Sequence, residues 1–121
     1  MVFGKTVSVE TRGYSDVHDL TPALREVVRE SGIRDGLVSV SSVGSTASIS
    51  TIEYEPALVE DLKELLEKLA PISMHSRHSA TWGDDNGFSH LRATLMGPGT
   101  TLPVVEGEIL LGTWQQVVLI D

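Results

Sequence analysis

The sequence of 121 residues contains no cysteine. Disulfide bonds, thiolate zinc sites, iron–sulfur clusters and a cysteine nucleophile are therefore excluded. The chain also has no basic segment followed by a long apolar run at its start, and no stretch approaches about 18 uninterrupted apolar residues. We therefore expect a soluble, cytoplasmic protein that has no membrane as a partner.

Basic residues are scarce, with 9 Lys and Arg against 17 Asp and Glu and a net charge of −8. Because nucleic acids and anionic membranes attract cationic surfaces, neither is an expected partner. A small phosphorylated substrate is compatible with this charge, since one arginine, a metal ion and oriented N–H groups can create a local positive site. Arg92 is the last cation in the chain, and we predict that it binds phosphate.

The length and the 40% hydrophobic content indicate one compact domain that spans residues 1–121. A domain of this size buries roughly two thirds of the surface of its unfolded chain, which is enough for independent folding. It is too small for a deep cleft of its own. We therefore expect any ligand pocket to lie between subunits.

Hydrophobic periodicity predicts two clear helices. The first runs from about Pro22 to Ser31, because a Thr-Pro pair favours a helix start and Gly32 a helix end. The second begins at Pro56, has leucines at three- and four-residue spacing up to Leu69, and ends before the next proline.

Alternating and β-branched residues predict several short strands. These are Val2–Thr11, Leu37–Val43, Ala47–Tyr54, Ser89–Met96, Thr101–Val105, Ile109–Leu111 and Trp114–Ile120. The strands before and after Gly44 are expected to meet at a tight connection. Residues 72–88 are expected to form a polar connection. Several strands with two or three helices indicate an α+β fold of two packed, mostly antiparallel β-sheets.

Histidines and carboxylates are concentrated in this polar connection and the segment after it. The group consists of His75, His78, His90, Asp84, Asp85 and Asn86. Imidazole and carboxylate groups are ligands for zinc and similar metals, and they also carry acid–base chemistry. In a strand, His90 and Arg92 would share one face, where the arginine could hold a phosphate. The alternative is a solvated loop in which Asp-Asn-Gly forms a turn.

Two further groups of residues have a functional and a structural interpretation. Ser45 and Thr46 could bind phosphate through backbone N–H groups, or they could form an ordinary hairpin tip. Glu53 and Glu55 point the same way in a strand, which suits acid–base work or a divalent ion. Glu55 is equally suited to the start of the helix at Pro56, where the helix dipole favours an acid. Neither a nucleophile elbow nor a P-loop motif is present.

Several motifs together resemble the YjbQ family, also called UPF0047, over nearly the whole chain. They are Gly44-Ser45-Thr46-Ala47, Ile52-Glu53-Tyr54-Glu55-Pro56, Asp61-Leu62, the segment from His78 through Asp85-Asn86 to His90-Leu91, Leu102-Pro103-Val104-Val105 and Gly112-Thr113-Trp114-Gln115-Gln116. This resemblance implies a YjbQ-like α+β fold of two packed sheets in a homotrimer. It also implies secondary thiamine-phosphate synthase activity, which joins a pyrimidine methyl diphosphate to a thiazole phosphate and releases pyrophosphate.

The resemblance also carries residues over. His78 and His90 match the two family histidines around the polar loop, and Asp85 and Asn86 match its acid-rich segment. Glu53 matches the acid after the hydroxyl-rich strand, and Asp61 matches the helix acid. Most relatives have a histidine at the position of Gly44, so one ligand or acid–base group of the family pattern is missing here.

The leading hypothesis is a trimeric enzyme of the thiamine-phosphate synthase type. Its predicted catalytic residues are His78, His90, Asp85 and Glu53, and its predicted substrate-binding residues are Ser45, Thr46, Asn86 and Arg92. A divalent metal, zinc or magnesium, is predicted on His78, His90 and Asp85. The alternatives are a non-catalytic trimer that binds a phosphorylated or metal-associated small ligand, favoured by Gly44, and a metal-dependent hydrolase.

Overall fold

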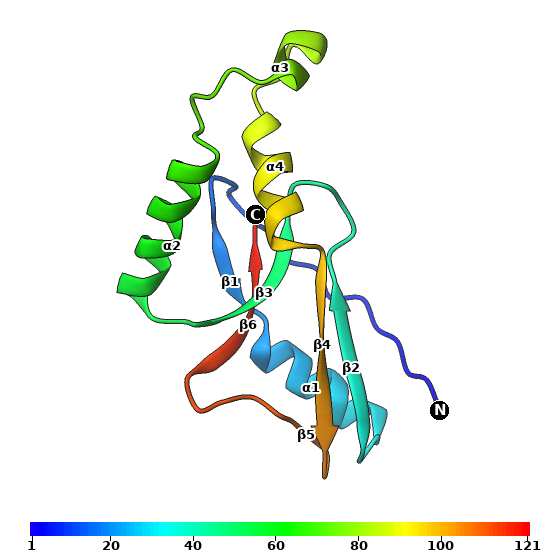
Figure 1. The fold of residues 1–121 in the computed structure, drawn as a ribbon. Helices are drawn as coiled ribbons and strands as arrows, with labels where there is room; N and C mark the ends of the chain where they lie inside the picture. Colours follow the sequence, from blue (N-terminus) through cyan, green and yellow to red (C-terminus); the bar gives the residue numbers. More distant parts are fainter.

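The computed structural model describes residues 1–121 and contains four helices and six strands (Figure 1). In chain order these are β1 (Val17–Asp19), α1 (Thr21–Ser31), β2 (Gly36–Ser41), β3 (Ser48–Glu53), α2 (Pro56–Leu69), α3 (Arg77–Trp82), α4 (Gly87–Met96), β4 (Gly99–Val105), β5 (Glu108–Ile109) and β6 (Gln115–Ile120). None of the four helices has both the length and the apolar character needed to cross a membrane.

The strands form two antiparallel sheets of three strands each. In the first sheet β6 lies between β1 and β3, and the order in the second sheet is β2-β4-β5. The predicted α+β class with two antiparallel sheets is therefore confirmed. It is accompanied by four helices instead of two or three.

Strand β6 is the centre of the core, and its side chains serve both faces of the first sheet. Val117 packs in one hydrophobic cluster, Val118 in another, and Leu119 and Ile120 repeat this alternation. This is the two-residue period of a strand that is covered on both sides. Val117 and Val118 are completely buried, and burial of each side chain contributes about 1.5–3 kcal/mol.

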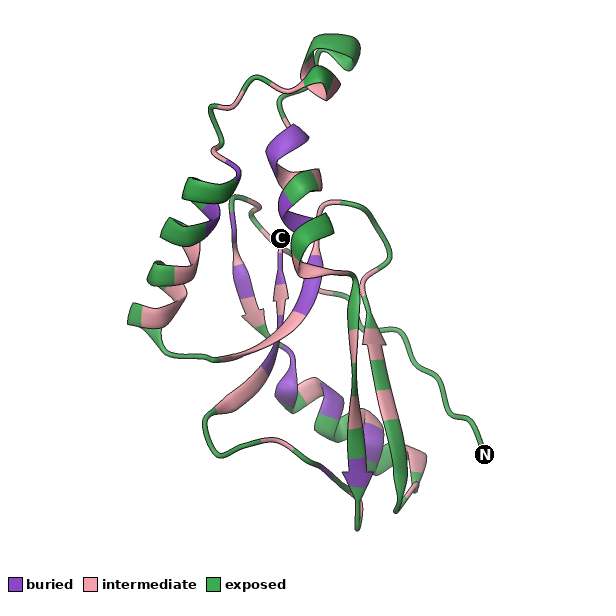
Figure 2. Ribbon diagram, in the orientation of Figure 1, coloured by how far each residue is buried: buried purple, intermediate pink, exposed green.

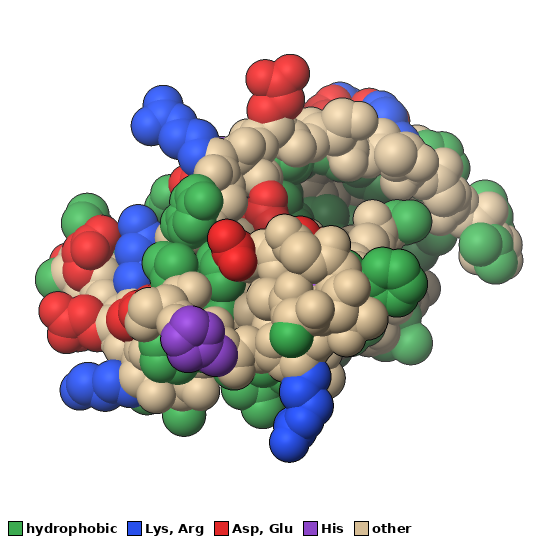
Figure 3. Space-filling model, turned by 90° about the horizontal axis from the view of Figure 1, so that it is seen from above, with side chains coloured by type: hydrophobic (Ala, Val, Ile, Leu, Met, Phe, Trp, Pro, Cys, Tyr) green, Lys and Arg blue, Asp and Glu red, His purple; other side chains and the backbone are tan.

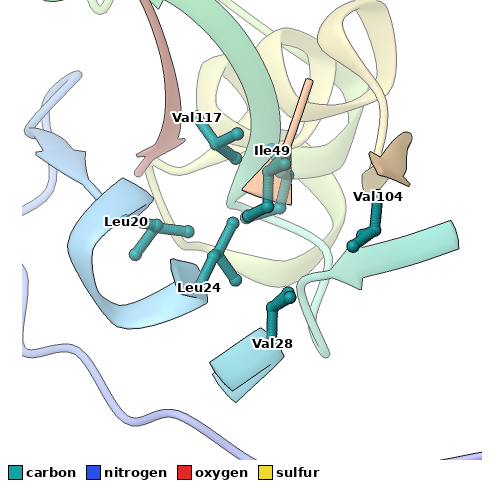
Figure 4. Packing of buried hydrophobic residues seen from close by; sticks show 7 residues of the cluster. Leu20, Leu24, Val28, Ile49, Val104 and Val117 are labelled. Atoms are coloured by element: carbon teal, nitrogen blue, oxygen red, sulfur yellow. The ribbon is translucent and has the colours of Figure 1, made fainter. Parts of the chain in front are cut away.

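Helix α1 covers one of these faces and joins the two sheets. Leu24 and Val28 lie on its buried side and pack with Ile49 of β3, Val104 of β4 and Val117 of β6 (Figure 4). The Thr21 hydroxyl accepts a hydrogen bond from the Val117 N–H at 2.9 Å, which fixes the start of the helix on β6. The predicted end of this helix at Gly32 is confirmed, because Gly32 has the left-handed φ of 68°.

Helix α2 covers the other face of the first sheet. Its Leu66 packs with Val17, Val118 and Ile120, and its outer side is exposed (Figure 2). At its start, the Glu55 carboxylate accepts hydrogen bonds from the N–H groups of Ala57 and Leu58 at 2.9 and 2.8 Å. The helix-start interpretation of Glu55 is therefore confirmed.

We predict that Glu55→Gln destabilises the fold at neutral pH and that this difference from the wild type disappears in acid. The two N–H donors hold the pKa of Glu55 below its ordinary value of 4.5. Because the unfolded chain then binds this proton more tightly, the carboxylate stabilises the fold fully above that value and ceases to do so as the pH falls through the lowered pKa. Thermal unfolding from neutral pH to about pH 3 measures the effect. An equal change in the exposed Glu64→Gln control would contradict this role.

Two strand predictions are wrong in part. Residues Val2–Thr11 form no strand and lie largely exposed along the side of the molecule (Figure 1). The strands before and after Gly44 exist, but β2 and β3 belong to different sheets. The connection through Gly44 therefore crosses between the sheets and is not a hairpin turn.

The segment Ser89–Met96, predicted as a strand, lies in helix α4, and the predicted loop 72–88 contains helix α3. Successive helical residues are rotated by about 100°, so residues two apart point to nearly opposite sides. Arg92 is accordingly buried while His90 is partly exposed. The predicted shared face of His90 and Arg92 is wrong for this reason.

Candidate functional site

Two histidines from separate helices meet at the end of the molecule formed by α3 and the start of α4. The imidazole rings of His78 on α3 and His90 on α4 contact each other edge to face, with centroids 4.8 Å apart and planes at 67°. Both side chains are partly exposed. Figure 3 views the molecule from this end.

The ring of His90 is oriented by a backbone carbonyl. Its Nδ1 lies 3.1 Å from the carbonyl oxygen of Ser45, in the connection between β2 and β3. A carbonyl oxygen can only accept, so Nδ1 donates and Nε2 of the neutral ring is left without a hydrogen. Nε2 is therefore the His90 nitrogen available for proton exchange with a ligand.

The ring of His78 is oriented through its other nitrogen. Its Nε2 lies 3.1 Å from Oδ1 of Asn86 and 3.2 Å from Oδ1 of Asp84. Both oxygens are acceptors, so Nε2 carries the hydrogen and Nδ1 is free. When His78 is protonated, the Asp84 carboxylate pairs with the imidazolium. The free nitrogen is Nε2 in His90 and Nδ1 in His78. Each ring is held by partners from a different segment of the chain.

Asn86 is placed to cap helix α4, but its side chain makes no capping hydrogen bond. Its Oδ1 serves His78 instead. The first N–H groups of α4 consequently have no side-chain acceptor, next to the histidine pair. The Asn86 side chain therefore orients the His78 ring and does not cap helix α4.

A family model described as UPF0047 protein YjbQ-like matches residues 5–121. The chain belongs to the YjbQ/UPF0047 family. A UPF0047 protein from Methanothermobacter thermautotrophicus is 36% identical over 116 residues, which are 96% of this chain and 80% of the relative. One from Archaeoglobus fulgidus is 33% identical over 115 residues, which are 95% of this chain and 87% of the relative.

Solved structures of YjbQ-like proteins have the same fold. A protein from Sulfolobus solfataricus P2, described as YbjQ-like and of unknown function, superimposes with a TM-score of 0.88 at 33% identity, over 93% of this chain and 80% of its own. A hypothetical protein from Aeropyrum pernix K1 gives 0.87 at 32% identity, over 93% and 83%. The YjbQ family and fold are therefore shown, whereas no activity comes with these names.

Among the predicted residues of this YjbQ chain, His78, Asn86 and His90 come together, and Ser45 joins them through its carbonyl group. Thr46 is half-buried and borders a small cavity of about 10 Å³ beside α4. The orientation of His90 by the Ser45 carbonyl could not be predicted from the sequence, because every residue has a carbonyl group.

The acidic residues of the prediction are distributed differently. Asp84, not Asp85, contacts His78, and Asp85 is exposed. Glu53 is exposed at the far end of β3, where the chain turns toward the start of α2 (Figure 1). The helix acid Asp61 is exposed on α2. Catalytic roles for Asp85 and Glu53 stay predictions.

The predicted metal set does not come together around the histidines. The structure has no group of three His, Asp or Glu side chains placed to hold a metal ion. His78 Nε2 is directed at Asn86 and Asp84 instead of at Asp85. The metal on His78, His90 and Asp85 stays a prediction, and the proposed chemistry uses only groups of the chain itself.

Arg92 is the clearest departure from the prediction. Its guanidinium is buried and donates to the Ala70 carbonyl at 2.8 and 3.0 Å, to the Ser15 hydroxyl at 2.8 Å and to the Glu67 carboxylate at 2.8 Å. It also lies 4.9 Å from the centre of the Phe88 ring. All three guanidinium nitrogens are engaged, so Arg92 is not free to bind a phosphate. It joins α4 to the end of α2 and to the turn before β1.

A large groove lies elsewhere on the molecule. It has a volume of about 650 Å³ and lies between the N-terminal segment, α1 and β2. Most of its lining side chains are apolar, and His78, Asn86 and His90 are not among them. The histidine pair, not this groove, is therefore the candidate site for acid–base chemistry.

Gly87 holds the two site helices together, and we predict that Gly87→Ala separates the histidines. A Cβ atom at Gly87 would lie 2.3 Å from Oγ and 2.7 Å from Cβ of Ser76, the residue that caps α3. Helix α3 would have to move by about 1 Å to restore normal contacts. The nuclear Overhauser effect between the ring protons of His78 and His90 should then become clearly weaker.

The matched experiment adds Ser76→Gly, which removes both clashing atoms. We expect the double variant to regain the contact between the rings, and Ser76→Gly alone to keep it. An unchanged ring contact in Gly87→Ala would contradict the tight packing of α3 on α4 at this point.

Proposed function

We propose that this YjbQ-family chain is the subunit of a homotrimeric transferase that joins a pyrimidine methyl diphosphate to a thiazole phosphate. Thiamine phosphate and pyrophosphate are the products. The observation that carries this proposal is the contact between His78 and His90, whose free nitrogens are oriented by separate hydrogen bonds. Paired, partly exposed imidazoles suit a reaction whose main requirement is charge control at a leaving group.

The reaction breaks one carbon–oxygen bond and forms one carbon–nitrogen bond. The diphosphate leaves the pyrimidine methylene carbon with the electron pair of the C–O bond. The lone pair of the thiazole nitrogen forms the new C–N bond, and that nitrogen becomes cationic. No oxidant or reductant takes part. Negative charge therefore accumulates on the leaving oxygen, where a proton or N–H donor lowers the barrier.

In this proposal an imidazolium of the pair donates its proton to the leaving pyrophosphate. Nε2 of His90 and Nδ1 of His78 are the nitrogens without a protein partner, so they are the ones that reach the substrate. The Asp84 carboxylate lies 3.2 Å from Nε2 of His78, and Asn86 keeps the ring in position. The proton returns from solvent after the products leave.

Phosphate groups are held in this proposal by hydroxyl and N–H donors of Ser45, Thr46 and the first turn of α4. This follows from the engagement of Arg92, which leaves no guanidinium on α4 for the task. Oriented N–H groups at a helix start favour anions because of the helix dipole. The local positive site then depends on the protonation of the histidines.

A homotrimer is supported by large hydrophobic side chains that the single chain leaves exposed. Leu65 and Leu69 lie one turn apart on α2, and Leu91 and Leu95 lie one turn apart on α4, all between 45% and 67% exposed. Exposed apolar patches of this kind are typical of subunit contacts. Sedimentation equilibrium should give the mass of three chains. A monomer at micromolar concentration would contradict the assembly.

The test of the function is product formation with both ring substrates and with each alone. We expect thiamine phosphate and pyrophosphate to appear in equal amounts only when both substrates are present. Release of phosphate or pyrophosphate from one substrate alone would instead indicate a hydrolase. Retention of activity after extensive chelation is expected, since the proposed steps use only protein groups. If chelation abolished the activity and zinc or magnesium restored it, the reaction would require a bound metal ion.

A non-catalytic trimer that binds a small phosphorylated ligand is the second candidate. The observation in its favour is Gly44, which stands where the family pattern has a histidine and so removes one acid–base group from the site. Saturable binding of either substrate without any turnover would favour it over the transferase.

A further inference from the structure

Trp82 is a large aromatic side chain at the candidate site that the fold itself does not use. Its side chain is 73% exposed, and no residue of α3 is buried. It takes part in neither of the ring contacts of the chain, which join Tyr14 to Phe88 and His78 to His90. Trp82 therefore does not anchor α3 on the rest of the molecule.

The position of Trp82 relates it to the histidine pair. It follows His78 by four residues in α3, so both side chains lie on the same side of that helix, with Cβ atoms about 5–6 Å apart. Gly83 ends the helix immediately afterwards with a left-handed φ of 74°. The indole thus stands at the rim of the site, one turn from the imidazole that contacts His90.

The chain has two tryptophans, and their comparison is informative. Trp114 is 71% exposed, but it lies in the connection between β5 and β6, at the end of the molecule opposite α3 (Figure 1). Both indoles are equally open to solvent, yet only Trp82 shares a helix face with a residue of the candidate site. The chain therefore supplies its own control for an exposed indole.

We propose that Trp82 is the surface on which the pyrimidine ring of the substrate stacks, and that it determines specificity for that ring. The inference rests on the proposed function and extends it to the recognition of one substrate. An indole face is apolar and binds planar heteroaromatic rings by stacking. A pyrimidine on Trp82 directs its substituents toward the imidazoles one turn away, where the leaving diphosphate needs a proton.

The first experiment uses Trp82 as its own reporter. In Trp114→Phe, Trp82 is the only tryptophan. We expect saturable quenching of its fluorescence by the pyrimidine methyl alcohol, which is the substrate without its diphosphate. In Trp82→Phe, where only Trp114 emits, the same titration should give no saturable quenching. Absence of quenching in Trp114→Phe would overturn the inference.

The second experiment measures the two substrates separately. Trp82→Ala should raise the KM for the pyrimidine substrate by about 10-fold or more, while the KM for the thiazole phosphate stays unchanged. Trp82→Phe, which keeps an aromatic face, should recover most of the loss. Equal KM values for wild type and Trp82→Ala would overturn the inference and leave the proposed transferase intact. Quenching of Trp82 fluorescence without any formation of thiamine phosphate would support the stacking role and contradict the proposed transferase.

The remaining alternative is that Trp82 contacts a neighbouring subunit. In that case Trp82→Ala would change the sedimentation mass and weaken both substrates alike. This outcome would overturn the stacking role. An unchanged mass together with the selective loss for the pyrimidine supports it.

Discussion

Replacing His90 with alanine is expected to reduce thiamine-phosphate formation by about 100-fold or more. General acid–base groups contribute typically about 10²–10⁴-fold to a rate. His90 is oriented for this role by the Ser45 carbonyl and contacts the ring of His78. Its side chain is partly exposed, so its removal should not unfold the chain. The measurement is kcat/KM with both substrates, together with the sedimentation mass.

His75 provides the matched control for this result. It is an exposed histidine in the connection between α2 and α3, outside the ring contact. His75→Ala should therefore keep normal activity. His78→Ala should lose about as much as His90→Ala, and the double variant should lose little more, because the pair acts as a unit. Full activity of His90→Ala with an intact trimer would exclude His90 as a catalytic residue.

Arg92→Ala is expected to have the largest effect on stability, about 3 kcal/mol. The change leaves the Ala70 carbonyl and the Ser15 hydroxyl without their donor and removes the cation above the Phe88 ring. The bond to Glu67 contributes less, because that carboxylate is half exposed. The thermal midpoint should fall by on the order of 10 °C.

Two further variants separate the geometry of Arg92 from its charge. Arg92→Lys keeps the charge but cannot reach three partners at once, so its stability should lie between those of wild type and Arg92→Ala. Arg25→Ala removes an exposed arginine from α1 and should change stability by less than about 0.5 kcal/mol. Unchanged stability of Arg92→Ala would contradict this structural role. If the wild type were protected by phosphate against thermal unfolding and Arg92→Ala were not, Arg92 would be a ligand-binding residue.

Much of the fold follows from local sequence patterns. Helices α1 and α2 have strong apolar periodicity and clear end signals, so their predicted bounds agree with the structure. The strands after Gly97 are short and separated by turn residues, and they appear close to the predicted positions. The family resemblance gave the α+β arrangement in advance, and the fold of the solved relatives agrees with it.

Helix α4 shows why the rest could not be predicted. Residues 89–96 alternate between apolar and polar side chains, which is typical of a strand. In the structure the buried side of α4 contains Phe88, Arg92 and Ala93, and Leu91 and Leu95 are exposed. Arginine is usually exposed and leucine usually buried, so the hydrophobic pattern of α4 does not indicate which side of the helix is buried. The helical signal is the nine-residue stretch without glycine or proline between the Asn86-Gly87 pair and Gly97, a weaker indication than periodicity.

The candidate site was predictable in its chemistry but not in its geometry. Histidines and an asparagine in a long polar segment identified His78, His90 and Asn86. The choice between Asp84 and Asp85 was not available, because adjacent carboxylates are equivalent until the turn that carries them is known. The strand predicted for the N-terminal segment is wrong for a related reason. An alternating sequence forms a strand only where the edge of a sheet is free to pair with it.

The most direct test is the tautomer of each site histidine, measured by the ¹⁵N shifts of the imidazole nitrogens in the neutral rings. We predict that the hydrogen lies on Nδ1 in His90 and on Nε2 in His78, and that His78→Gln changes the ¹⁵N shifts of His90. A hydrogen on Nε2 of His90, together with ¹⁵N shifts of His90 that stay the same in His78→Gln, would contradict the paired site on which the proposed function rests.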